Sequence, residues 1–162
     1  MNRKAVSNIF VSCGVVALLF SQLFSAEAPQ SREAKQIVAL VDKAAALTES
    51  KGKAAFPNFK QKGSEWFKGS TYLFIGDMSG VTLMHPANPE LEGKSILDLK
   101  DANGKAFMRE FIETAKSKGS GWVEYMWPKP GEKTPSKKMS YVKMAKMPSG
   151  EMVIVGAGLY VK

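Results

Sequence analysis

The sequence contains very few of the residues on which most enzymes and metal sites depend. Its 162 residues include one cysteine and one histidine. A site that needs several thiolates or imidazoles therefore cannot form, and a haem would find only His85 or a methionine as its axial ligand. We find no Walker motif, dinucleotide fingerprint or nucleophile-elbow motif. These absences predict a protein that is not an enzyme and that holds no metal or cofactor.

Arginine is also scarce, although the chain is basic. The formal net charge is +8, but the only arginines are Arg3, Arg32 and Arg109. Arginine is the preferred residue for bidentate contacts to phosphates and bases. The lysines are scattered and interleaved with acidic residues. The charge therefore indicates a solvated basic surface, and we expect no nucleic-acid partner.

The N-terminus has the order of a secretory signal peptide. Arg3 and Lys4 precede an apolar run at residues 9–20, and small and polar residues follow it. The run is shorter than the ~20 residues that a membrane span needs. We predict a signal peptide at residues 1–26 and a periplasmic mature protein with no membrane span after cleavage. The alternative is an uncleaved signal that anchors the protein in the inner membrane.

Residues 27–70 are predicted to form an N-terminal helical region. Apolar residues between positions 37 and 47 recur at spacings of three and four, and Ser31 is a suitable N-cap, so a helix should run from about 32 to 51. The same reasoning predicts a second helix at about 105–118, ended by Gly119.

The rest of the chain is predicted to form an antiparallel sheet. Expected strands lie at 71–75, 81–85, 122–127, 137–143 and 151–160. The order of helix, hairpin, helix and three strands predicts an α+β fold, with five antiparallel strands and helices packed on them. In the last strand, Gly156 and Gly158 should allow close approach of another group.

The stretch from 119 to 143 concentrates aromatic rings and lysines. By strand parity Tyr125 and Trp127 share a face, and so do Met139 and Tyr141 in the next strand, opposite Lys138. Lys138 and Tyr141 should therefore reach one pocket only if a bulge intervenes or Lys138 precedes the regular strand. Spacing alone favours a packed core here. His85, at the end of a strand and beside a loop, is equally consistent with a structural role and a pocket role.

Several segments, in order along more than half of the chain, resemble a known family. They are residues 63–67, 72–77 with Gly80, 84–86, 88–93, 101–104, 121–128, 138–142 and 156–160. They are similar to single Cache domains of the second subfamily (sCache_2), which are extracytoplasmic sensor domains of bacterial chemoreceptors and histidine kinases. The resemblance implies a PAS-like five-stranded antiparallel sheet with a long N-terminal helix. It also implies that residues 71–162 form the ligand-binding Cache domain.

The resemblance also implies a ligand and a site. The expected ligand is a short organic acid such as acetate, propionate, lactate or pyruvate. Lys138 would meet its carboxylate, the tyrosines and His85 would form hydrogen bonds to it, and two further residues would shape the apolar end. The implied ligand-binding residues are Tyr72, Met84, His85, Tyr125, Trp127, Lys138 and Tyr141.

The chain reaches Lys162 soon after the last predicted strand, without a kinase or methyl-accepting region. We therefore expect a free-standing module that acts through a membrane-bound signalling partner. One alternative is a structural or protein-interaction module whose pocket is filled by its own side chains. A weaker alternative is an amine binder with a cage of rings, against which the charge of Lys138 argues.

Overall fold

The computed structural model describes residues 31–161. The predicted signal peptide lies outside these residues. Within them, no helix combines the length and the apolar character that crossing a membrane requires.

The N-terminal region is helical, as predicted. Helix α1 (Arg32–Lys51) begins where the Ser31 hydroxyl accepts a hydrogen bond from the Ala34 amide at 3.1 Å. It ends at Gly52, whose φ of +57° favours glycine. A 3₁₀ turn η1 (Gly52–Ala55) and the short helix α2 (Phe56–Phe59) follow.

The sheet has six antiparallel strands, in the order β1-β2-β6-β5-β4, with β3 also paired to β2. Their bounds are β1 Phe67–Lys68, β2 Thr71–Asp77, β3 Thr82–Met84, β4 Ser120–Pro128, β5 Pro135–Lys146 and β6 Met152–Tyr160. Five of these strands were predicted. The sixth is the two-residue β1, which lies inside the region predicted as helical. The α+β fold and the long N-terminal helix are confirmed.

The connection from β3 to β4 contains a 3₁₀ turn η2 (Pro89–Leu91) and helix α3 (Phe107–Lys118). Helix α3 begins two residues later than predicted. It ends as predicted, because Gly119 has a φ of +76° and its amide donates to the Ala115 carbonyl.

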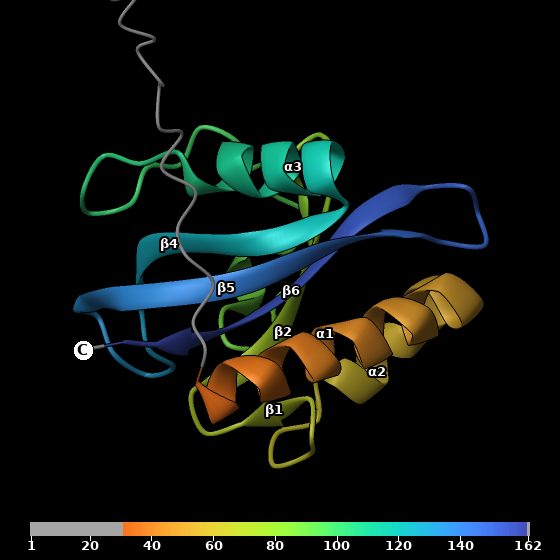
Figure 1. Ribbon diagram of the computed structural model, residues 1–162, viewed down its shortest axis with the longest axis horizontal. Coiled ribbons are helices and arrows are strands. Elements are labelled where there is room, and N and C mark those ends of the chain that lie inside the picture. Colours follow the sequence, from red (N-terminus) through yellow and green to blue (C-terminus); the bar gives the residue numbers. More distant parts are fainter. Residues whose placement is uncertain (1–30, 162) are drawn as a thin grey trace, which may run out of the picture.

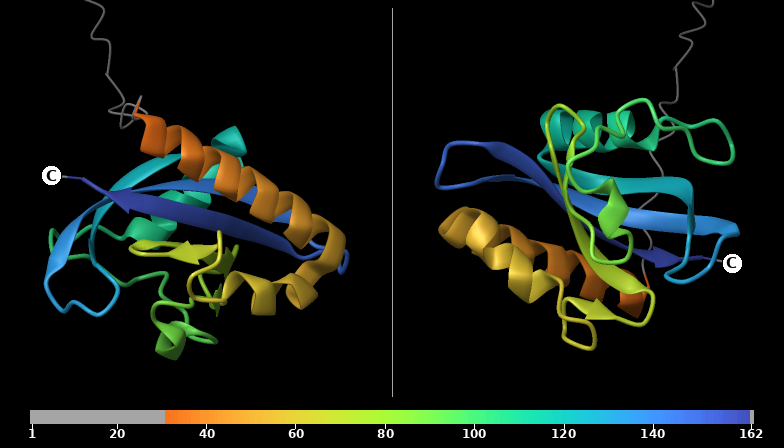
Figure 2. Two further views of the ribbon diagram at one scale, coloured as in Figure 1. Left: turned by 90° about the horizontal axis from the view of Figure 1, so that it is seen from below. Right: turned by 180° about the vertical axis from the view of Figure 1, so that it is seen from behind.

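The helices cover opposite faces of the sheet. Helix α1 packs on β5 and β6, and α3 packs on the other side, mainly against β4 (Figure 1). The views in Figure 2 show α1 along one side of the strands and α3 on the other. We call these sides the α1 face and the α3 face.

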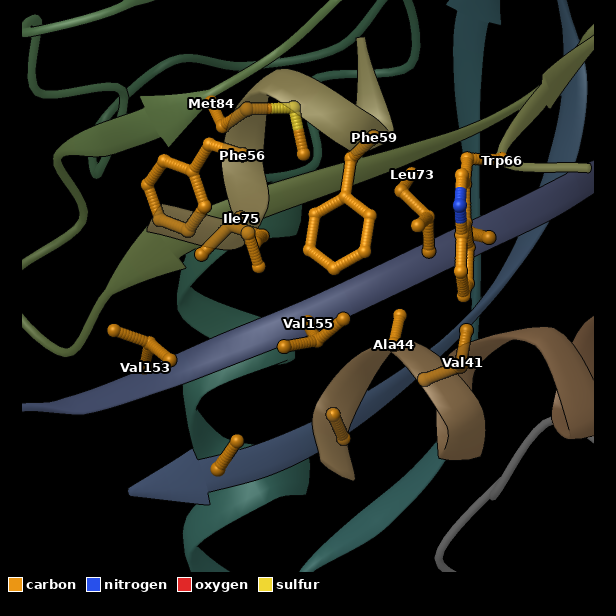
Figure 3. Packing of buried hydrophobic residues seen from close by; sticks show 14 of the residues in the cluster. Val41, Ala44, Phe56, Phe59, Trp66, Leu73, Ile75, Met84, Val153 and Val155 are labelled. Carbon is orange, nitrogen blue, oxygen red and sulfur yellow. The ribbon is translucent and has the colours of Figure 1, made fainter. Parts of the chain in front are cut away.

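The core on the α1 face is apolar. Figure 3 shows Val41 and Ala44 of α1 packed against Leu73 and Val155 of the sheet, with Phe59 of α2 beside them. The core on the α3 face contains Phe74, Phe107, Phe111 and Tyr125. The two cores therefore differ in composition, and the difference lies in the buried polar groups described next.

Candidate ligand site on the α3 face

Lys138 is fully buried on the α3 face. In the regular register of the sheet it lies opposite Tyr125 of β4 and Tyr160 of β6. Residues opposite each other in an antiparallel pair project from the same face. The strand needs no bulge to bring Lys138 and Tyr125 together, and the opposite parity expected for Lys138 and Tyr141 holds.

Aromatic rings surround the Lys138 ammonium. Its Nζ lies 4.0 Å from the centroid of the Tyr72 ring, 5.2 Å from that of Tyr160, 5.8 Å from that of Phe74 and 6.0 Å from that of Tyr125. Within residues 31–161, no hydrogen-bond acceptor or acidic group pairs with this Nζ. Because the charged form is desolvated, burial lowers the pKa of Lys138 to about 7.

Two glycines of β6 make room for these side chains. A Cβ on Gly158 would lie 3.0 Å from Lys138 Cε and 2.3 Å from the Ser140 hydroxyl. A Cβ on Gly156 would lie 2.4 Å from the Phe74 ring. The groups that approach these glycines closely, as expected, are therefore the side chains of Lys138, Ser140 and Phe74.

Tyr72 and His85 bring two more unpartnered polar atoms to the same place. Within residues 31–161, the Tyr72 hydroxyl and His85 Nδ1 are buried and make no hydrogen bond of normal length and angle, although Tyr160 and Trp127 lie close enough to the Tyr72 hydroxyl to influence its pKa. Their rings lie 5.1 Å apart between centroids. Burial, followed by the nearby positive charge of Lys138, lowers the pKa of His85 to about 3, so this imidazole is neutral at pH 7. Burial also raises the pKa of Tyr72, so its hydroxyl stays protonated and able to donate.

A small cavity of about 20 Å³ lies between the sheet and α3. Most of its lining residues are aromatic or apolar, and the polar ones are Thr82 and His85. The complete lining is Phe74, Ile75, Thr82, His85, Ile96, Phe107, Met108, Phe111, Tyr125 and Trp127. His85 and Trp127 also line an outer, more polar pocket of about 200 Å³, which Tyr72 and the loop after β4 help to form. His85 and Trp127 thus lie between the outer pocket and the inner, largely apolar cavity, and Lys138 lines neither of them.

The structure brings together five of the seven predicted site residues: Tyr72, His85, Tyr125, Trp127 and Lys138. It does not bring Met84 or Tyr141 there. Met84 is buried in the α1-face cluster near Phe56 (Figure 3), since it precedes His85 and alternation turns it to the other side.

Tyr141 pairs in register with Trp122, and the two residues pack on the α1 face. Its hydroxyl donates to the Ser120 hydroxyl at 2.7 Å. The expected placement of Met84 and Tyr141 in the site is therefore wrong.

Sequence reasoning missed several residues of this site. Phe74 has the same strand parity as Tyr72, and the pattern alone was sufficient to find it. Phe107 and Phe111 lie inside the helix that was predicted at about 105–118, but nothing in that pattern marked them as the wall of a cavity. Tyr160 and Thr82 gave no local signal, because only the pairing of distant strands brings them here.

The arrangement suits an anion. It offers an ammonium, a phenol and an imidazole nitrogen, each without a partner, in surroundings of low polarity where charge-assisted hydrogen bonds are strong. A ligand ammonium has no free cage, because Lys138 itself occupies the ring of aromatic residues. In residues 31–161, no group of three or more His, Cys, Asp or Glu side chains is placed to hold a metal ion.

Comparison with known proteins gives a consistent result. A family model described as a Cache domain (dCache_2) matches residues 34–162. The periplasmic sensor domain of a chemotaxis protein is 35% identical, with a TM-score of 0.63 over 77% of this chain and 88% of that domain. A Cache chemosensory domain described for its carboxylic acid recognition is 36% identical, with a TM-score of 0.60 over 80% of this chain and 87% of that one.

Two curated proteins match over shorter regions. The methyl-accepting chemotaxis protein McpP of Pseudomonas putida is 39% identical over 90 residues, which are 56% of this chain and 16% of McpP. The sensor histidine kinase MctS of Rhizobium johnstonii is 37% identical over 71 residues, which are 44% of this chain and 15% of MctS. The match thus spans about one sixth of the length of these relatives.

Proposed function

This chain belongs to the Cache domain family, and from that premise we propose that it is a periplasmic sensing module whose ligand is a short organic acid. Cache sensor domains of chemoreceptors and histidine kinases are ligand-binding, non-catalytic modules. The expected family is confirmed, while the matching family model is dCache_2 and not the expected sCache_2.

The observation that carries the proposal is the unpaired ammonium of Lys138. Burying an ion without a partner costs several kcal/mol even after the protein relaxes. This cost is comparable to the net free energy of unfolding of a whole domain. Cation–π contact with the Tyr72 ring returns only about 2 kcal/mol. A carboxylate beside Nζ would offset the remainder and would also accept hydrogen bonds from Tyr72 and His85.

The size of the site limits the length of the acid. The inner cavity measures about 20 Å³, and Phe107, Met108 and Phe111 of α3 close it on one side. It has room for little more than one water molecule, so it suits only the end of a short carbon chain. The rest of the acid would lie in the outer pocket of about 200 Å³, which Tyr72 and His85 line. The neighbour described for carboxylic acid recognition supports the same ligand class.

A module with a self-filled pocket is the second candidate. It is favoured by the rings that already enclose Nζ, and by the fact that Lys138 lines neither the cavity nor the outer pocket. A core filled by its own side chains should, however, satisfy its buried polar atoms. Three of them are unsatisfied around one point of this site, which makes a ligand the better account.

We propose that the ligand state is passed to a membrane-bound signalling protein. The relatives are parts of chemoreceptors and sensor kinases, and similar domains are described as periplasmic. The proposed signal peptide at residues 1–26, followed by the helical region at 27–70 and the ligand-binding domain at 71–162, fits export to that compartment.

The test is a calorimetric screen of the purified protein against acids of two to five carbons. We expect at least one of them to bind with a dissociation constant below the millimolar range and to raise the melting temperature by mass action. Matched amides of the same acids should not bind, because they lack the charge that pairs with Lys138. A screen in which no acid binds or stabilises the protein at millimolar concentration would overturn the proposal.

A further inference from the structure

Thr82 carries a fourth unpartnered polar atom, which the proposed carboxylate contacts do not use. The residue is 3% exposed, and its Oγ1 makes no hydrogen bond. Its backbone is satisfied, since the Thr82 amide donates to the Lys94 carbonyl at 2.9 Å and its carbonyl accepts from the Gly93 amide at 2.8 Å. Only the side chain is left without a partner, and such a buried hydroxyl costs about 1–3 kcal/mol.

Thr82 lies at the inner end of the site. Thr82 and His85 both line the small cavity under α3, but only His85 also lines the outer pocket that Tyr72 helps to form. The only other hydroxyl on the cavity wall, that of Tyr125, is paired with the Ser140 hydroxyl at 3.1 Å. Among the described residues that line this cavity, Thr82 thus carries the one unpartnered hydroxyl, and His85 Nδ1, which also borders the outer pocket, is the other unpartnered polar atom.

We propose that Thr82 is a specificity-determining residue that binds an oxygen atom on the carbon chain of the ligand. The preferred ligand is then a short hydroxy acid or oxo acid rather than a plain alkanoic acid. Its carboxylate lies toward Lys138, Tyr72 and His85, and its hydroxyl or carbonyl oxygen meets Thr82 Oγ1. This inference rests on the proposed function and names the subclass of acid for the same site.

The chemistry of Thr82 admits both kinds of oxygen. A threonine hydroxyl rotates freely, so that it donates to a carbonyl oxygen and either donates to or accepts from a hydroxyl. A plain alkanoic acid would leave Oγ1 unsatisfied, or would require a water molecule in a cavity with little room to spare. One neutral hydrogen bond gives a preference of roughly fivefold.

The experiment compares acids of equal length that differ by one oxygen. Calorimetric titrations would use propionate against lactate and pyruvate, and butyrate against 3-hydroxybutyrate. The unsubstituted protein should bind the oxygenated acid roughly fivefold more tightly in at least one of these pairs. Thr82→Val keeps the side-chain volume and removes the hydroxyl, so it should abolish the preference by weakening only the oxygenated acid. Thr82→Ser keeps the hydroxyl and should retain the preference, and melting curves of both variants check that they are folded.

The outcomes separate the two proposals. Equal or tighter binding of the plain acid in every pair would overturn the role of Thr82 while leaving the carboxylate site in place. A preference that persists in Thr82→Val would also overturn it. If the unsubstituted protein binds no acid of either kind, the proposed function itself fails.

Discussion

The two faces of the sheet are built from the same strands but carry different kinds of core. On the α1 face, the buried Thr48 hydroxyl donates to the Ala44 carbonyl at 2.8 Å, and apolar side chains fill the remaining core. On the α3 face, the site collects unpartnered polar atoms from Tyr72, Thr82, His85 and Lys138. One face thus stabilises the fold, while the other contains groups that cost stability unless a ligand pairs with them.

The unpartnered polar atoms of the α3 face mark it as the functional side of the sheet. Replacing a buried ion pair with apolar side chains of similar volume is often neutral or stabilising by about 1–4 kcal/mol, and an unpaired buried ion lacks even the partner that offsets its loss of hydration. The α3 face therefore departs from the most stable arrangement, as expected of a site shaped for a ligand.

Removing the ammonium should have the largest effect. Lys138→Met keeps an unbranched side chain of similar length and should weaken acid binding by more than a hundredfold, because the fully buried cation proposed to pair with the carboxylate is lost. Isothermal titration calorimetry measures this. Lys137→Met, which changes the neighbouring half-exposed lysine, is the matched control and should leave affinity within about twofold. Retained affinity in Lys138→Met would remove the assigned role of this residue.

A cavity made on the α1 face should affect stability alone. Leu73 is fully buried between α1 and the sheet, so Leu73→Ala should lower the free energy of unfolding by about 2–5 kcal/mol. Urea unfolding measures this loss. Acid affinity should stay within about threefold, since Leu73 faces away from the site. A loss of binding comparable to that of Lys138→Met, in protein that is still folded, would contradict the separation of the two faces.

The pH dependence of stability should differ between the unsubstituted protein and Lys138→Met. The pKa of Lys138 is about 7 in the folded state, below its ordinary value near 10.4 when unfolded. Between these values the unfolded state binds more protons, so this lysine destabilises the fold fully below pH 7 and progressively less as the pH rises. Urea unfolding from pH 6 to 9 should show the stability gap between the two proteins narrowing with pH, and a constant gap would contradict the buried, unpaired state of Lys138.

The same titration should appear in binding. Only the charged ammonium pairs with a carboxylate, so affinity should fall by about tenfold per pH unit above pH 7, until the higher pKa of the complex is reached. Below pH 7 affinity should level off, because His85 stays neutral down to a pKa of about 3. Calorimetry in buffers of different ionisation enthalpy should show proton uptake on binding near pH 8. Affinity that is independent of pH from 7 to 9 would contradict this account.

Removing one tyrosine hydroxyl on each face should give the smallest effects, on stability for Tyr141 and on acid affinity for Tyr72. Tyr141→Phe removes the hydrogen bond to Ser120 and should cost about 1 kcal/mol of stability without changing acid affinity. Tyr72→Phe removes a hydroxyl that has no partner, so stability should stay the same or rise, while affinity falls by about tenfold. Melting curves and titrations of both variants measure these effects. Weaker acid binding in Tyr141→Phe, or unchanged acid binding in Tyr72→Phe, would contradict the assignment.

Much of the fold could be predicted because its signals are local. Helical periodicity located α1, the N-cap at Ser31 fixed its start, and Gly119 fixed the end of α3. The sheet followed from five apolar strands with turn residues between them. The two-residue β1 has no periodicity of its own, and only its pairing with β2 identifies it.

The site was harder to predict because it depends on strand register. Lys138 and Tyr125 face the same way because β4 and β5 pair in a register that sequence spacing does not reveal. The resemblance implied that Lys138 and Tyr141 share a pocket, although strand parity puts them on opposite faces, and the structure follows the parity. Met84 and His85 are adjacent in the chain, yet they belong to opposite faces. Thr82 was missed because only the three-dimensional structure shows that its hydroxyl lines a cavity and makes no hydrogen bond in residues 31–161.

The central claim is tested most directly by the unfolding free energies of the unsubstituted protein and Lys138→Met at pH 7, each measured with and without the tightest-binding acid. Without acid, Lys138→Met should be the more stable protein, because it lacks the buried unpaired charge. With saturating acid the order should reverse, since only the unsubstituted protein gains stability from binding. If Lys138→Met is the less stable protein in both conditions, Lys138 is a satisfied part of the core and the α3 face is not a carboxylate site.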